Sequence, residues 1–192
     1  MATSLEAEVA TSEIRGLDLP IGPLSGQNRT LHMADTSPRQ TLSVGKAIFF
    51  GTLIVGTLDA LDAIIVFGLR SGATPARIFR GIASGLLGSA AGSGGTPAAL
   101  LGVAVHYTVA LGIVTTYVLV SRALPALNRR PFVYGPLYGI AAYLVMNFVV
   151  IPMSAIGTFP RFNAFGTTNG VLIHMIGVGL PTALIAARVR RS

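Results

Sequence analysis

The chain has no cysteine and no tryptophan among its 192 residues, and only 11% of those residues are charged. The absence of cysteine excludes disulfide bonds, thiolate metal sites and a cysteine nucleophile. Soluble domains carry about 25% charged residues, whereas 52% of this chain is hydrophobic and its mean hydropathy is +0.68. The composition therefore indicates a membrane protein whose interfacial aromatic residues are tyrosine and phenylalanine.

The acidic side chains are few, and the formal net charge is +7. Such a charge also occurs in proteins that bind nucleic acid, but in a membrane protein the loop lysines and arginines set the topology. We therefore expect the lipid bilayer as partner and no nucleic acid. The sequence also lacks a phosphate-binding loop, a zinc-protease helix and a catalytic triad order, so we expect no enzymatic activity.

Four long apolar segments divide the chain after residue 45. They run over about residues 47–69, 97–121, 133–156 and 169–187, and each has roughly 19 to 25 residues. About 20 residues are needed to cross a hydrocarbon core of ~30 Å as a helix. The sequence therefore predicts an all-α integral membrane protein whose residues 46–192 form a four-span bundle.

Residues 1–45 differ from the rest of the chain, because they hold five of the seven acidic residues and no long apolar run. This composition is typical of a disordered tail. Four spans place both ends of the chain on one side, which carries ten lysines and arginines against four on the other side. The positive-inside rule then predicts that both termini lie in the cytoplasm.

An extra helix is predicted between the first two spans. Thr74 has the character of an N-cap, and Pro75 suits the first position of a helix over about residues 75–88. A glycine-rich stretch, residues 89–97, ends this helix before the second span. The helix is long enough to lie on the membrane surface or to dip into the membrane.

Residues 46–192 contain only two carboxylates, Asp59 and Asp62, and both lie in the first span. A lipid-facing aspartate near the middle of a helix costs about 2.5–3.5 kcal/mol, and a spacing of three puts both on one helix face. The pair must therefore face the protein interior, water or a cation. Three roles stay open: a static ion pair with Arg77 and Arg80 of the extra helix, a proton or ion site, and a water-lined mouth or subunit contact.

Two histidines, His106 and His174, lie on the second and fourth spans. Each is expected to be a hydrogen-bonded core histidine, or, if the two face each other, they could ligate a bis-His haem. Together with Asp59 and Asp62 they also offer four ligands suited to a divalent metal. We expect no cofactor, with haem and metal as alternatives.

Five polar side chains lie at similar depth in their spans. Counted from the outer end of each span, they are about 5 to 10 residues in, which corresponds to a spread of about 8 Å. They are Asp59, Asp62, His106, Asn147 and His174. This coincidence predicts one outward-facing polar cavity in which the aspartates share protons or, with the histidines, hold a cation.

The third span opens with Gly135-x-x-x-Gly139. Two glycines at this spacing allow another helix to approach closely. Packing within one bundle and formation of a homo-oligomer both explain the motif.

The second half of the chain carries single residues at fixed spacing, over roughly residues 98–191: His106, Tyr117, Pro125, Gly135, Gly139, Pro152 and His174. Their order and spacing resemble the YagU-type family of small bacterial inner-membrane proteins. The resemblance implies an integral inner-membrane protein with no established molecular activity. One position departs from the pattern, because Asn147 stands where the family pattern has a histidine, so any metal or haem role of that histidine does not carry over.

Three functions are therefore compared with the structure. In the first, the protein is a proton- or ion-responsive conduit or sensor with a polar layer in the outer half of the membrane. In the second, it is a structural or accessory membrane subunit without a ligand. The third is a bis-His haem electron carrier.

Overall fold

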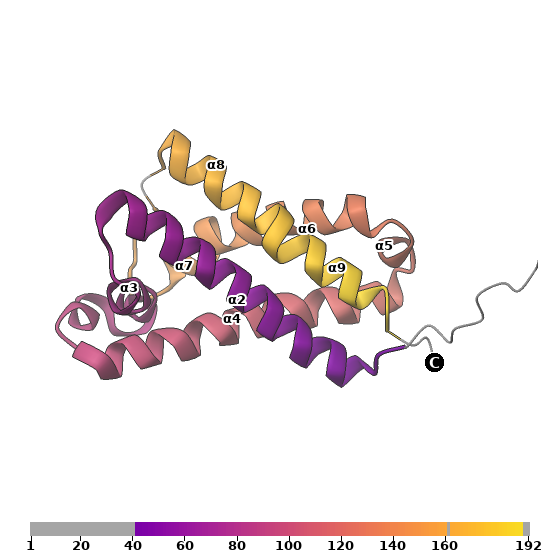
Figure 1. The fold of residues 1–192 in the computed structure, drawn as a ribbon, viewed down its shortest axis with the longest axis horizontal. Helices are drawn as coiled ribbons and strands as arrows, with labels where there is room; N and C mark the ends of the chain where they lie inside the picture. The colour runs from indigo at the N-terminus through magenta and orange to yellow at the C-terminus, as the bar shows by residue number, and fades with distance from the viewer. Residues whose placement is uncertain (1–40, 161, 190–192) are drawn as a thin grey trace, which may run out of the picture. The chain divides into compact units, whose positions relative to one another are not determined.

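A computed structural model describes residues 41–160 and 162–189, and residues 1–40 of the tail predicted over residues 1–45 lie outside this part of the chain. Four of the helices are long and apolar enough to cross a membrane (Figure 1). They run over Val44–Ser71, Gly95–Ala123, Pro131–Met153 and Ala164–Ala186. The predicted all-α fold with four spans is therefore confirmed.

The elements follow one another with short connections. In chain order they are α2 (Val44–Ser71), α3 (Pro75–Leu87), the 3-10 helix η2 (Gly88–Gly92), α4 (Gly95–Ala123), α5 (Ala126–Arg129), α6 (Pro131–Val145), the π-helix η3 (Met146–Val150), α7 (Ile151–Met153), α8 (Ala164–Ile173), the π-helix η4 (His174–Gly179) and α9 (Leu180–Ala186). The third span is thus α6, η3 and α7 in sequence, and the fourth is α8, η4 and α9.

Side-chain caps explain where two spans begin earlier than predicted. The first span begins at Val44, inside the segment predicted as tail, because the Ser43 hydroxyl accepts a hydrogen bond from the Lys46 amide. The fourth span begins at Ala164 rather than at residue 169, because the Asn163 side chain accepts from the Gly166 amide at 2.9 Å. Such caps satisfy the free N–H groups of the first helical turn.

The extra helix α3 forms where the sequence predicts it. The Thr74 hydroxyl accepts from the Arg77 amide, and Pro75 occupies the first turn. Figure 1 shows α3 running across the direction of the long helices, at the end of the bundle where α2 finishes and α4 begins. Its backbone crosses α4 at Gly102, where a side chain would collide with the Phe79 carbonyl. A further hydrogen bond, from the Ala155 amide to the Gly85 carbonyl at 2.9 Å, ties α3 to the segment after α7.

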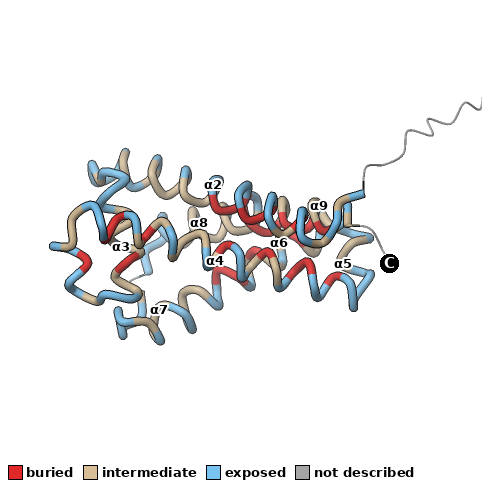
Figure 2. The backbone as a smooth tube through the Cα atoms, turned by 90° about the horizontal axis from the view of Figure 1, so that it is seen from below, coloured by how far each residue is buried: buried red, intermediate tan, exposed pale blue. Residues whose placement is uncertain are grey.

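The buried core lies toward the opposite end of the bundle, on the facing sides of α2, α4 and α9 (Figure 2). It contains Val55, Val114, Tyr117, Val118, Val178, Ala183 and Ala186. The Tyr138 hydroxyl of α6 donates to the Ile113 carbonyl of α4 at 2.7 Å, which joins these two helices at the edge of the core. The Leu42 amide donates to the Arg188 carbonyl, so the first span begins where the last span ends.

Large apolar side chains point away from the bundle along all four spans. Phe49 is 59% exposed, Phe132 is 71% exposed and Ile176 is 61% exposed. Soluble proteins rarely expose so much contiguous apolar surface, whereas lipid accommodates it without cost. This surface supports a multi-pass membrane protein in contact with a bilayer.

Gly135 and Gly139 pack against the fourth span of the same chain. A side chain on Gly139 would collide with the backbone of His174, and one on Gly135 would meet the backbone of Leu180 and Gly179. The motif therefore serves the contact between the third and fourth spans and fixes the position of His174.

We predict that Gly139→Ala lowers the free energy of unfolding by about 1–3 kcal/mol, because the two spans must separate to admit the methyl group. Gly112 is the matched control, because a side chain there meets no other atom within 4 Å. Gly112→Ala should leave stability unchanged or raise it by up to about 1 kcal/mol through helix propensity. Unfolding in detergent micelles measures both, and equal stability of the two variants would contradict this packing.

Candidate functional site

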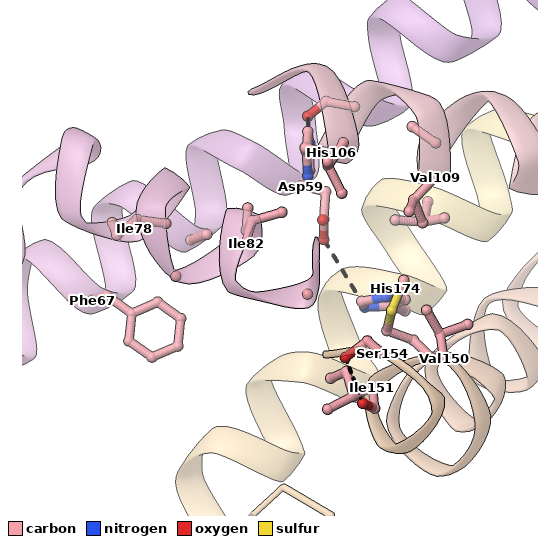
Figure 3. A pocket seen from close by; sticks show the side chains of 18 of the residues that line it. Asp59, Phe67, Ile78, Ile82, His106, Val109, Val150, Ile151, Ser154 and His174 are labelled. Carbon is pink, nitrogen blue, oxygen red and sulfur yellow. Dashed lines mark hydrogen bonds and ion pairs between the residues drawn. The ribbon is translucent and has the colours of Figure 1, made fainter. Parts of the chain in front are cut away.

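A cavity of about 540 Å³ lies in the half of the bundle that α3 covers (Figure 3). Its walls come from α2, α3, α4, the third span and η4. Most lining residues are apolar, among them Phe67, Ile78, Ile82, Val109, Val150 and Ile151. The polar side chains that line it are Asp59, Ser71, Arg77, His106, Ser154 and His174. A cavity of this size and character is typical of a small-molecule site.

Asp59 and His174 face each other across this cavity (Figure 3). The Asp59 Oδ1 lies 4.0 Å from the His174 Nδ1, and the two side chains are 30% and 15% exposed. The same Nδ1 lies 2.9 Å from the Gly170 carbonyl oxygen, and this shorter contact is the hydrogen bond. Because a carbonyl only accepts, Nδ1 carries a proton and Nε2 is the atom that can take up a second one. The carboxylate then stands beside a group that gains a positive charge.

His106 forms part of the wall of the same cavity. Its Nε2 lies 2.7 Å from the Gly56 carbonyl oxygen of α2, so Nε2 carries the proton. The ring lies edge-on to Phe79 of α3 and to the neighbouring Tyr107. His106 therefore links three helices as a hydrogen-bonded histidine. The Nε2 of His106 is thus engaged with the Gly56 carbonyl.

The second aspartate is held by a residue that the sequence did not mark as functional. The Asn169 Nδ2 donates to the Asp62 Oδ2 at 2.8 Å. Nearer the end of α2, the Arg70 guanidinium lies 3.9 Å from the centre of the Phe165 ring of α8. These contacts close the side of the cavity between α2 and the fourth span. Asn169 could have been found as one of the few polar residues of that span.

The predicted ion pairs of Asp59 and Asp62 with Arg77 or Arg80 are not formed among the described residues, where the ionisable side chain within 4.0 Å of Asp59 is His174. The reason is the length of α2. It continues to Ser71, which is 71 − 59 = 12 residues and therefore about 18 Å beyond Asp59, and only residues 72–74 separate it from α3. The arginines of α3 thus lie at the end of the bundle. Arg77 still reaches the rim of the cavity that contains Asp59.

The structure brings three of the five predicted polar residues together and places the other two elsewhere. Asp59, His106 and His174 line the cavity, and Asp62 does not. The Asn147 Nδ2 donates to the Tyr143 carbonyl of its own helix at 2.8 Å, and its neighbour Met146 lines the cavity instead. The observed polar layer therefore consists of one carboxylate and two imidazoles.

No group of three or more histidine, aspartate or glutamate side chains within residues 41–160 and 162–189 is arranged to hold a metal ion. The divalent-metal alternative would need Asp59, Asp62, His106 and His174 to converge, and Asp62 is directed to Asn169 instead.

Both π-helices line the cavity, and each ends two residues before a proline. The segment η3 contributes Met146 and Val150 and precedes Pro152, and η4 contributes His174 and Val178 and precedes Pro181. A proline cannot donate to the preceding turn and its ring crowds the carbonyl there, and one wide turn relieves both problems.

Comparison with family models, with curated proteins and with solved structures gives no match for this chain. The resemblance to the YagU-type family therefore stays a prediction that depends on the spaced residues of the second half.

Proposed function

We propose that this chain is a bacterial inner-membrane protein that senses protons through a cavity open to the outer side of the membrane. The observation that carries the proposal is the Asp59 carboxylate, which lies 4.0 Å from the His174 imidazole inside a mostly apolar cavity. An imidazole is the side chain that ordinarily changes its charge between pH 5 and pH 8. A protonated His174 would form an ion pair with the Asp59 carboxylate, whereas a neutral His174 would not.

The charged groups that line the cavity favour a response to pH over a permanent ion pair. The charged or titratable groups that line it are Asp59 of α2, Arg77 of α3, His106 of α4 and His174 of η4. Arg77 lines the cavity from α3 and makes no ion pair with Asp59 among the described residues. His174 is the ionisable side chain that lies within 4.0 Å of Asp59.

The end of the cavity that adjoins the buried core favours a sensor over a conduit. Val55, Ile113 and Val178 line it there and lie in or against the buried core. The Tyr138 hydroxyl closes the gap between α6 and α4 by donating to the Ile113 carbonyl. An ion that reached Asp59 would therefore meet a packed apolar core and no continuing polar path.

The second candidate is a structural or accessory subunit without a ligand. The hydrogen bond from Asn169 to Asp62 favours it, because this bond joins two spans outside the cavity. In that case Asp59 and His174 would serve the same purpose as Asp62 and Asn169, and the protein would not respond to pH.

The proposed topology predicts that Ser93 and Thr158 lie outside the cytoplasm and Ala126 inside it. All three residues are exposed in the described part of the chain, and the native chain has no competing thiol. Single cysteines at positions 93 and 158 should react with a membrane-impermeant maleimide in intact spheroplasts. A cysteine at position 126 should react only after permeabilisation, and the reverse pattern would contradict the orientation.

The pH response is tested with a nitroxide attached to a single cysteine in place of Ala63, which lines the cavity between Asp59 and Phe67. Acidification should change the mobility of the nitroxide and its access to a water-soluble relaxation agent. Asp59→Asn should abolish this change, because the charge beside His174 is lost. Asp62→Asn is the matched control and should keep it.

Two outcomes would contradict the proposal and favour the structural subunit. One is a nitroxide signal that does not depend on pH in the otherwise native chain. The other is a pH dependence that persists unchanged in Asp59→Asn.

A further inference from the structure

A second cavity, of about 350 Å³, lies on the other side of α3. It is lined by Arg77, Arg80, Gly81, Ser84, Gly88, Ser89, Ala91 and Gly92. Arg77 and Gly81 line both cavities, so the two spaces meet along one edge of α3. The helix therefore presents apolar Ile78 and Ile82 to the large cavity and arginines and hydroxyls to the small one.

The small cavity is suited to an anion. The described residues contain two carboxylates, and these are directed to His174 and Asn169 rather than to an arginine. Arg77 and Arg80 accordingly have no acidic partner within residues 41–160 and 162–189. Two guanidinium groups beside serine hydroxyls provide the donors that bind phosphate oxygens.

The large cavity is suited to a hydrocarbon chain. Between its rim at Ser71 and the polar layer at Asp59 it extends about 18 Å along α2, which exceeds half of a hydrocarbon core of ~30 Å. Asp62 and Arg70 close this stretch on the side of α8. On the opposite side, residues of α4 and η3 line the cavity.

Gly81 leaves the passage between the two cavities free. A side chain at this position would meet no other protein atom within 4 Å. It would instead project into the edge that both cavities share. The glycine is thus not required for helix packing, and its missing side chain leaves room for a ligand.

We propose that the two cavities together bind one anionic glycerophospholipid from the outer leaflet. Its phosphate lies between Arg77 and Arg80, with Ser89 as a further donor. One acyl chain passes over Gly81 into the apolar part of the large cavity and ends above Asp59. The inference deepens the proposed function, since it names the ligand of the cavity whose deep end holds the sensing pair.

The charge of the small cavity selects the class of lipid. A phosphatidylcholine brings its own positive charge toward two uncompensated arginines, whereas a phosphatidylglycerol brings none. Repulsion between the choline ammonium and the two guanidinium groups should then favour phosphatidylglycerol by at least about tenfold in affinity.

The test measures lipid bound to the full-length protein by native mass spectrometry in detergent, with phosphatidylglycerol or phosphatidylcholine of identical acyl chains. The variant R77Q/R80Q should lose the preference for phosphatidylglycerol. Its control is R129Q/R130Q, which removes two exposed arginines from the other end of the bundle. Gly81→Leu should reduce binding of both lipids about tenfold, while Gly112→Leu, also in open space, should not. Leucine favours a helix over glycine, so neither glycine variant should fold less well.

Three results would overturn the proposal. Equal binding of the two lipids would show that the site does not select an anionic headgroup. Unchanged lipid binding by Gly81→Leu would show that no acyl chain passes over Gly81. Complete displacement of the lipid by glycerol 3-phosphate would assign the small cavity to a free phosphate. Asp59→Asn should keep the lipid preference, so a failure of the pH response and a failure of lipid binding are distinguishable.

Discussion

The desolvation of two aspartates inside a lipid-embedded helix is the constraint on which the rest of the structure depends. Each would cost about 2.5–3.5 kcal/mol if it faced hydrocarbon. The fourth span meets this constraint with His174 opposite Asp59 and Asn169 opposite Asp62. These contacts fix the depth and rotation of the fourth span against α2. Gly139 then lets the third span approach the backbone of His174 directly.

Close packing at one end and an open space at the other follow from the same helices. Toward α9 the spans converge on small and β-branched residues such as Ala183 and Val114, both fully buried. Toward α3 the wide turns η3 and η4 replace regular α-helix at the cavity wall. The polar layer lies between these regions, so it contacts the packed core on one side and the apolar part of the large cavity on the other. A ligand in that part of the cavity would control how much water reaches Asp59 and His174.

The sequence predicted the features that depend on local pattern, and it missed those that depend on helix rotation. The length of the apolar segments predicted the four spans, and Thr74 followed by Pro75 predicted the start of α3. Residue counting placed Asp59, His106 and His174 at one depth, and they do line one cavity. The same counting placed Asn147 with them, but depth does not determine the direction of a side chain, and Asn147 bonds to its own helix. Pairing of the aspartates with the arginines of α3 was one of three roles that the sequence left open, and the length of α2, which continues to Ser71, places those arginines at the end of the bundle instead.

The central claim is that Asp59 and His174 face each other inside the membrane. Solid-state NMR of the protein in lipid tests it directly, by measuring dipolar coupling between isotope-labelled aspartate carboxyl carbons and histidine ring nitrogens. The chain has only four aspartates and three histidines, so few signals compete. The structure, with 4.0 Å between Oδ1 and Nδ1, predicts a coupling that disappears in Asp59→Asn and persists in Asp62→Asn. The absence of any coupling to His174 in the native chain would contradict the account.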